Sequence, residues 1–79
     1  MSRISEHLDA RPFQVAISTD RALPLRKWDH RGTIHAPSSR SAAYLAGVAG
    51  DIIAEHVTAD GIAYEFPGHF VHVGFGAQS

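Results

Sequence analysis

No cysteine occurs in the 79 residues of this chain, so neither disulfides nor thiolate zinc sites can hold a small fold together. Apolar packing must therefore supply the stability. A chain of this length buries only roughly 60 to 65% of its unfolded surface, which is enough for one core and too little for two. We expect residues 1–79 to form a single domain.

The clearest local pattern is a pair of alternating segments near the C-terminus. Residues 62–66 alternate bulky apolar side chains with Ala63 and Glu65, and a second alternating run covers residues 69–75. Pro67-Gly68 lies between them and is typical of a turn in which glycine supplies a positive φ. The pattern predicts a β-hairpin.

Two strands are predicted in the N-terminal half. Residues 13–17 alternate apolar and polar side chains, and a less regular strand runs from about Leu25 to His30, resuming at residues 33–35 beyond a bulge or turn at Gly32. Before them, Ser2 to Ala10 suits about two helical turns, with serine as the N-cap.

The main helix is predicted from Ser39 to His56, because serines after Pro37 are a helix-start signal and good helix formers follow. A spacing of about 100° per residue gathers the bulky side chains in one sector. This predicted core face holds Leu45, Val48, Ala49, Ile52, Ile53 and His56.

Small residues fill the opposite sector of that helix, namely Ala43, Gly47, Gly50 and Ala54. Each interior glycine costs about 0.8 to 1 kcal/mol in helix propensity relative to alanine. The glycines are either tolerated at a bend or allow another element or a second copy of the chain to approach closely. We interpret this sector as a candidate dimer or close-packing face.

The predicted fold class is α+β, a two-layer sandwich with one main helix on a mostly antiparallel four-stranded sheet in the order ββαββ. The helix and one sheet face would share the core. The core residues expected are Phe13, Val15, Ile17, Ile62, Tyr64, Phe66, Val71, Val73, Leu45, Val48 and Ile52.

Catalysis is not indicated, and the chain is interpreted as a non-enzyme. Cysteine is absent, no Gly-x-Ser-x-Gly elbow occurs, and the serines at 38, 39 and 41 are explained by helix capping. No cofactor is expected.

Four histidines were weighed as metal ligands: His30, His35, His69 and His72. Residues 69 and 72 of one strand point to opposite faces, and no His-Glu-x-x-His motif is present. We therefore expect no metal site, and a histidine-dependent metal protein or enzyme remains the weakest alternative.

Basic residues gather around the single tryptophan in a run that starts at Arg21. The candidate binding set taken from this run comprises Arg26, Lys27, Trp28, His30 and Arg31. Arginine and tryptophan are enriched as anchors of protein interfaces, and basic residues beside an aromatic ring also suit nucleic acid. A solvated loop is the third interpretation. The formal net charge of −1 disfavours direct nucleic-acid binding, so we assign this set to a protein partner.

No segment has the roughly 18 consecutive apolar residues of a membrane span, and the first residues lack the apolar region of a signal peptide. A cytoplasmic protein is the expectation.

In size, lack of cysteine, near-neutral charge and helix-on-sheet layout, the chain resembles the small phage-encoded anti-CRISPR inhibitors. The resemblance lies in layout across the whole chain, and it carries over no individual residue. It implies a stoichiometric inhibitor that docks on a nucleic-acid-targeting ribonucleoprotein complex and blocks its DNA binding or cleavage. The sequence-based hypothesis is thus a protein-binding module, with a homodimeric accessory subunit as the alternative.

Overall fold

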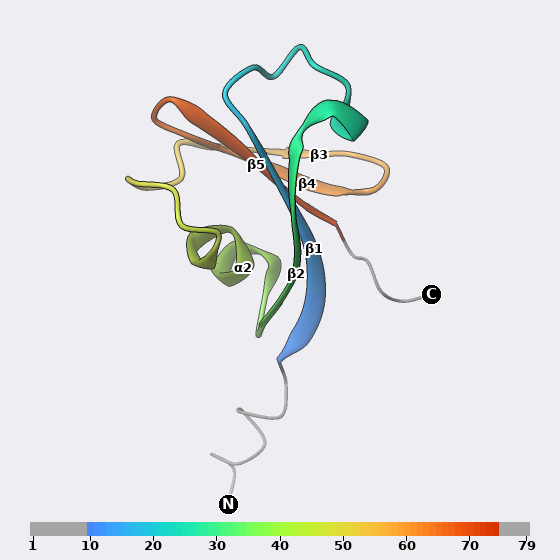
Figure 1. Cartoon of the computed structure of the whole chain (residues 1–79). Helices are drawn as coiled ribbons and strands as arrows, with labels where there is room; N and C mark the ends of the chain where they lie inside the picture. The colour runs from blue at the N-terminus through green and yellow to red at the C-terminus, as the bar shows by residue number, and fades with distance from the viewer. Residues whose placement is uncertain (1–9, 75–79) are drawn as a thin grey trace, which may run out of the picture.

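The computed structural model describes residues 10–74 and contains one sheet and one α-helix (Figure 1). In chain order the elements are β1 (Arg11–Ser18), the 3-10 helix η1 (Leu25–Lys27), β2 (Asp29–Ala36), α2 (Ser39–Leu45), β3 (Ala54–Val57), β4 (Gly61–Phe66) and β5 (His69–Gly74). The N-terminal helical segment predicted from Ser2 to Ala10 lies outside the described part of the chain, except for Ala10, which belongs to no helix or strand.

All neighbouring strands are antiparallel, in the spatial order β2-β1-β5-β4-β3. The predicted α+β class, with one helix on an antiparallel sheet, is confirmed. The predicted number of strands was wrong, because the sheet has five strands and the four-residue β3 lies at its edge beside β4.

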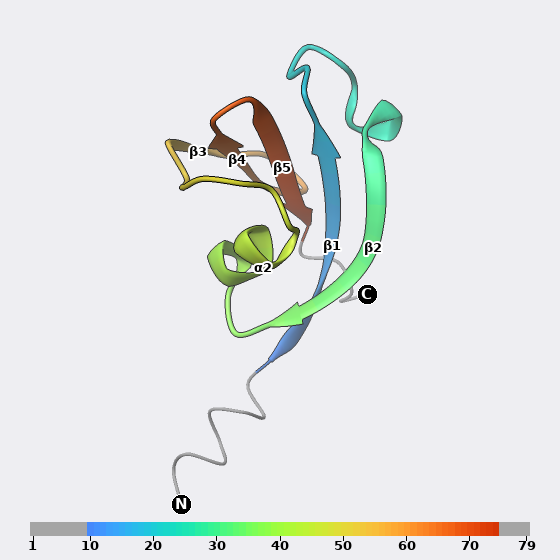
Figure 2. The same cartoon turned by 60° about the vertical axis from the view of Figure 1, so that its left-hand side comes forward.

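The helix covers one face of the sheet, and β1 and β2 curve around it (Figure 2). Alternate strand residues point to this side and form the core with two helix alanines and Ala36. The buried cluster consists of Phe13, Val15, Ile17, Ala36, Ala42, Ala43, Tyr64, Phe66, Val71 and Val73, with Ile34, Ala46, Val48, Ile52 and Ile62 packed against it.

The C-terminal hairpin is confirmed. Phe66 pairs with His69 across the Pro67-Gly68 turn, and Gly68 adopts a positive φ of 80°. The helix start is confirmed as well, because the Ser38 hydroxyl accepts a hydrogen bond from the N–H of Ser41.

The length of the main helix was predicted wrongly: it ends at Leu45 rather than at His56. Gly47 follows the C-cap with a φ of 95°, a left-handed conformation that ends helices and that glycine adopts without strain. Residues 46–53 then cross to the sheet edge, where residues 54–57 gain ladder hydrogen bonds to β4 in place of helical ones. Backbone conformation at glycine thus outweighs the helical spacing of the apolar residues.

The predicted small-residue helix face is therefore absent. Ala43 is buried in the core, Gly47 and Gly50 lie in the loop, and Ala54 begins β3. Gly50 does make a close approach, since a Cβ at this position would lie 3.0 Å from Cδ of Pro67. A residue without a side chain is favoured at position 50, because the loop packs against Pro67 in the β4–β5 turn. This close contact joins two segments of the same chain and is not a contact with a second copy.

Four side chains predicted on the core face of the helix are instead exposed, namely Leu45, Ala49, Ile53 and His56. Leu45 retains 61% and Ile53 62% of its accessible surface, because both lie at or beyond the true helix end. The second strand also begins later than predicted. Leu25 to Lys27 form a single 3-10 turn, and the predicted irregularity at Gly32 is a bulge opposite the Val15/Ala16 step.

Candidate functional site

The face of the sheet opposite α2 carries small and imidazole side chains in a single cross-strand row. Ala16 of β1 pairs with His30 of β2 and His72 of β5, and His72 pairs with Ala63 of β4, which in turn pairs with His56 of β3. The two alanines leave space above the sheet that larger residues would fill. We call this side of the sheet the open face.

Trp28 forms a partial roof over the open face. Its side chain follows directly after η1, and only 8% of its surface is exposed. The indole N–H donates to the carbonyl oxygen of Leu23 at 2.9 Å, and the ring packs edge-on against His72 with centroids 6.4 Å apart. The loop between β1 and β2 is thereby fixed above the centre of the sheet.

His72 is fixed from the other side by Thr58. The Thr58 hydroxyl accepts the N–H groups of Asp60 and Gly61, and its oxygen lies 3.1 Å from Nε2 of His72. The single proton of this hydroxyl has two acceptors within reach, the Gly61 carbonyl oxygen and Nε2 of His72, each 3.1 Å away. Burial lowers the pKa of His72, nearby His30 adds to the lowering, and Asp60 acts in the opposite direction.

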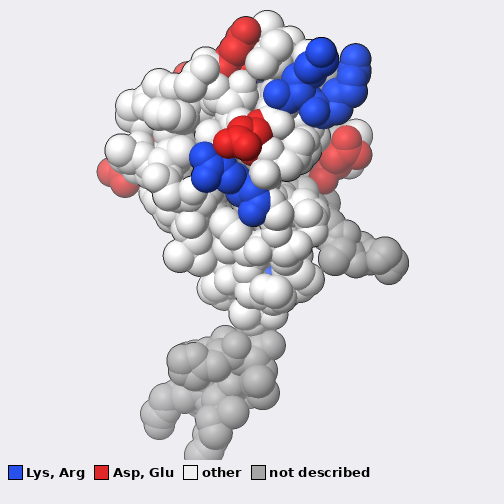
Figure 3. All heavy atoms as spheres, in the orientation of Figure 1, with Lys and Arg blue, Asp and Glu red and all other residues white. Residues whose placement is uncertain are grey.

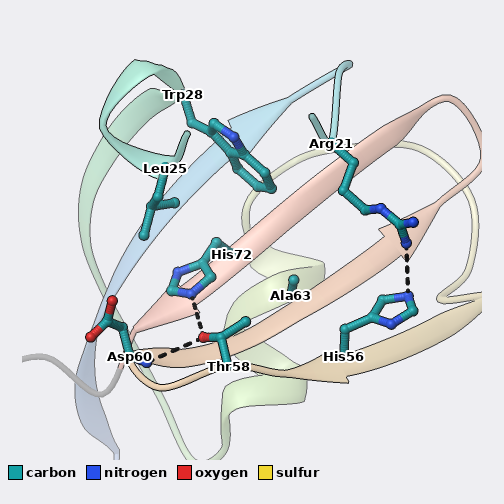
Figure 4. Close-up of a pocket in the computed structure, with 8 residues that line it drawn as sticks. All are labelled: Arg21, Leu25, Trp28, His56, Thr58, Asp60, Ala63 and His72. Carbon is teal, nitrogen blue, oxygen red and sulfur yellow. Dashed lines mark hydrogen bonds between the residues drawn. The ribbon is translucent and has the colours of Figure 1, made fainter. Parts of the chain in front are cut away.

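A hollow of about 460 Å³ lies between the roof and the far edge of the open face (Figure 4). Ala63 forms its floor, and Trp28 and Leu25 form one wall. The remaining lining residues are Arg21, His56, Thr58, Asp60 and His72. The volume falls in the range of about 300 to 1,000 Å³ that is usual for small-molecule sites.

Arg21 lies at the rim of this hollow. Its guanidinium donates to Nε2 of His56 at 3.5 Å and lies over the Phe70 ring, 6.0 Å from the centroid. Within residues 10–74, no carboxylate lies within 4 Å of Arg21, whereas Arg31 pairs with Asp29 and Arg40 with Glu55. A carboxylate oxygen of Glu65 lies 3.8 Å from Nε2 of His56.

The predicted partner-binding set is divided by the structure. Arg26 and Lys27 are exposed on η1, and Figure 3 shows basic side chains gathered over this corner of the molecule. Trp28 does not project from this corner, because its indole is buried against His72 and donates to the carbonyl oxygen of Leu23. Its assignment to a partner surface stays a prediction.

The other two members of the set lie on β2. Arg31 is exposed at the bulge and bonds Asp29 at 2.9 Å, and His30 belongs to the open-face row. A smaller hollow, lined in part by Lys27, Arg31 and His69, lies beside this corner.

The candidate metal ligands do not converge. His69 and His72 lie on opposite faces of β5, and His35 lies near the far end of β2. Within the described residues, no group of three or more His, Asp or Glu side chains is arranged to hold an ion.

The edge strand β3 presents unpaired main-chain groups. The N–H of Thr58 donates to the carbonyl oxygen of Gly61, so these two residues form a hydrogen-bonded pair of the β3–β4 ladder. In an antiparallel ladder every second residue of a strand belongs to such a pair, and the residues between them direct their N–H and C=O to the other side. Val57 and Glu55 are such intermediate residues, so their main-chain groups point away from β4. Val57 retains 81% of its surface. Arg40 of α2 pairs with Glu55, and Ile52 N–H donates to the Tyr44 hydroxyl, so the helix flanks this edge.

Comparisons with known proteins found no matching family model, no matching curated protein and no matching solved structure. No helix in the described part of the chain is long and apolar enough to cross a membrane.

Sequence reasoning placed Arg21 in the basic run around Trp28 but left it out of the partner-binding set, and it did not single out Thr58 or Ala63. Thr58 carried one readable signal, because a threonine before Asp60-Gly61 is typical of a turn in which the hydroxyl bonds nearby backbone. Ala63 carried none, since strand register gives it its place. Arg21 showed a basic character in the sequence, but its position at the hollow depends on the path of the β1–β2 loop.

Proposed function

We propose that this chain is a protein-binding module that adds an extended segment of its partner to the edge strand β3. The observation that carries the proposal is the outward main-chain N–H and C=O of Glu55 and Val57 on an edge flanked by exposed Ile53 and Val57. In strand addition, main-chain hydrogen bonds give affinity and neighbouring side chains give specificity.

The two edges of the sheet differ in how well they are protected. Charged pairs lie at both edges, Asp29 with Arg31 on β2 and Arg40 with Glu55 at β3, but β2 also carries a bulge, a feature that natural sheets use to prevent edge pairing. The described β3 has neither a bulge in its pairing with β4 nor a proline. We therefore assign the partner to β3.

The partner's identity rests on the resemblance to anti-CRISPR inhibitors, and a cytoplasmic inhibitor of a nucleic-acid-targeting complex stays a prediction from that resemblance. The exposed Arg26 and Lys27 would then contact the same partner outside the strand. A homodimer is the alternative, now through β3, because the small-residue helix face on which it was first based does not exist.

Val57 provides a sharp test. Val57→Pro removes an outward N–H without breaking a bond to β4, and Val57→Ser removes the apolar side chain while keeping that N–H. The immobilised chain and both variants are compared for stoichiometric capture of proteins from a cell extract, beside an Arg26→Glu/Lys27→Glu variant.

We expect the partner to be retained by Val57→Ser and lost by Val57→Pro. Sedimentation measures whether the wild-type chain associates with itself. If it does, and if Val57→Pro does not, the partner is a second copy of this chain. Retention by Val57→Pro, loss confined to the basic variant, or absence of both capture and self-association would contradict strand addition.

A further inference from the structure

The hollow on the open face has two unlike ends. Trp28, Leu25 and Ala63 offer apolar surface at one end, beside which Asp60 lies, and Arg21 lies at the rim with His56 at the other end. The carboxylate of Asp60 disfavours an anionic group at the first end, so the charge of an anionic ligand would lie at the Arg21 end. Figure 4 shows these groups facing a common space from the loop, β3 and β4. This argument depends on the open face and is independent of a partner at β3.

The apolar end is held in a fixed shape. Trp28 is anchored through Leu23, and His72 beneath it is anchored through Thr58. Ala63 keeps the floor low, since it is the small member of its cross-strand row between two histidines. A ligand that enters here therefore displaces water without reordering these side chains, which lowers the cost of binding.

The rim favours an anion. Arg21 is permanently charged, and its contacts within the described residues are to a ring nitrogen of His56 and to the aromatic face of Phe70. Its fork of N–H donors matches the two oxygens of a carboxylate, and such charge-assisted pairs are about twice as strong as neutral ones.

We propose that this hollow binds a small organic carboxylate, with its apolar body between Trp28 and Ala63 and its carboxylate on Arg21. A ligand of this kind pairs the charge at the rim and covers the exposed apolar wall in one step. The volume of about 460 Å³ accommodates a ring or a short chain with one acidic group.

Trp28 is the only tryptophan in the sequence, so its fluorescence reports directly on the hollow. The probe is cyclohexanecarboxylate, which does not absorb where tryptophan is excited, and cyclohexanecarboxamide is its neutral counterpart. Titrations are made in a carboxylate-free buffer at low ionic strength, because added salt screens an exposed charge such as Arg21. Amide NMR shifts locate the bound probe.

We expect saturable binding of the acid, about tenfold tighter than of the amide, a ratio equivalent to one charge-assisted contact. Arg21→Gln should bring this ratio close to one, whereas the matched Arg11→Gln, at the exposed start of β1, should leave it unchanged. Shifts should cluster at Trp28, Ala63 and His72. Equal affinity for acid and amide, an unchanged ratio in Arg21→Gln, no saturable response, or shifts centred on α2 would overturn the proposal.

Discussion

The two faces of the sheet are built from the same strands and are covered in different ways. On the helix face, Phe66 and Val71 are buried under α2 with their neighbours and leave little free space. On the open face, Ala16 and Ala63 lie beneath a single roofing side chain, Trp28, and a hollow remains. Alternate residues of one strand thus serve two tasks, since one set supplies apolar burial and the other shapes a surface.

The largest expected effect lies on the helix face. Phe66 is 1% exposed and packs edge-on against Tyr44, with ring centroids 5.7 Å apart. Phe66→Ala should lower the free energy of unfolding by about 3 to 5 kcal/mol, because it removes a buried ring and leaves a cavity. Urea denaturation followed by circular dichroism measures the loss. A cost no greater than that of an exposed substitution would contradict the assignment of the core to this face.

A smaller effect is expected from the roof of the open face. Trp28→Phe keeps an aromatic ring and loses the hydrogen bond to the Leu23 carbonyl, so stability should fall by about 1 to 2 kcal/mol. Circular dichroism again reports the unfolding, since the fluorescent side chain is gone. If this loss equalled that of Phe66→Ala, the distinction between the two faces would fail.

The third effect depends on pH. The folded pKa of His72 is lowered from 6.5, so the unfolded chain takes up the proton first as the pH falls. The neutral ring's contribution to stability is therefore complete above about pH 7 and is lost progressively below pH 6.5.

Urea midpoints at pH 7.5 and 5.5 test this contribution. The decrease at the lower pH should be smaller in His72→Gln than in the wild-type chain, and the exposed His35→Gln should behave as the wild type. The same decrease in all three proteins would show that His72 is not the group responsible.

The smallest effect is expected at the exposed edge strand β3. Val57→Ser should change stability by no more than about 0.5 kcal/mol, because the side chain is 81% exposed. Thermal unfolding of this variant beside the wild type is the measurement. A loss of several degrees in Tm would mean that Val57 supports the fold, and that β3 is not a free edge.

The hairpin of β4 and β5 was predictable because its information is local. Alternation in residues 62–66 and 69–73 and the turn at Pro67-Gly68 all favour the same structure. The N-cap at Ser38 was predictable for the same reason, since a serine after proline offers an acceptor to the first helical N–H groups.

The helix end and β3 could not be read so directly. Val48, Ile52 and Ile53 happen to recur at helical spacing, and this periodicity concealed a loop whose conformation is set by Gly47 and Gly50. The edge strand 54–57 is short and mostly exposed, so it shows no alternation of apolar and polar residues.

The open face was least predictable, because its parts are distant in the sequence. Trp28 among basic residues has the composition of an interface anchor, and its burial depends on Leu23 and His72, neither of which its neighbours in sequence reveal. The composition of the segment was informative about its polarity and uninformative about which way the indole points.

The order of the strands also bears on how the chain reaches its fold. Every pairing in the sheet joins neighbours along the chain except β1 with β5, whose residues Val15 and Val73 lie opposite each other. Two local hairpin units can form early, and their union at this single seam requires closing a loop of more than fifty residues. Closure of that seam is the slow, entropically costly event of folding, and it completes both faces at once.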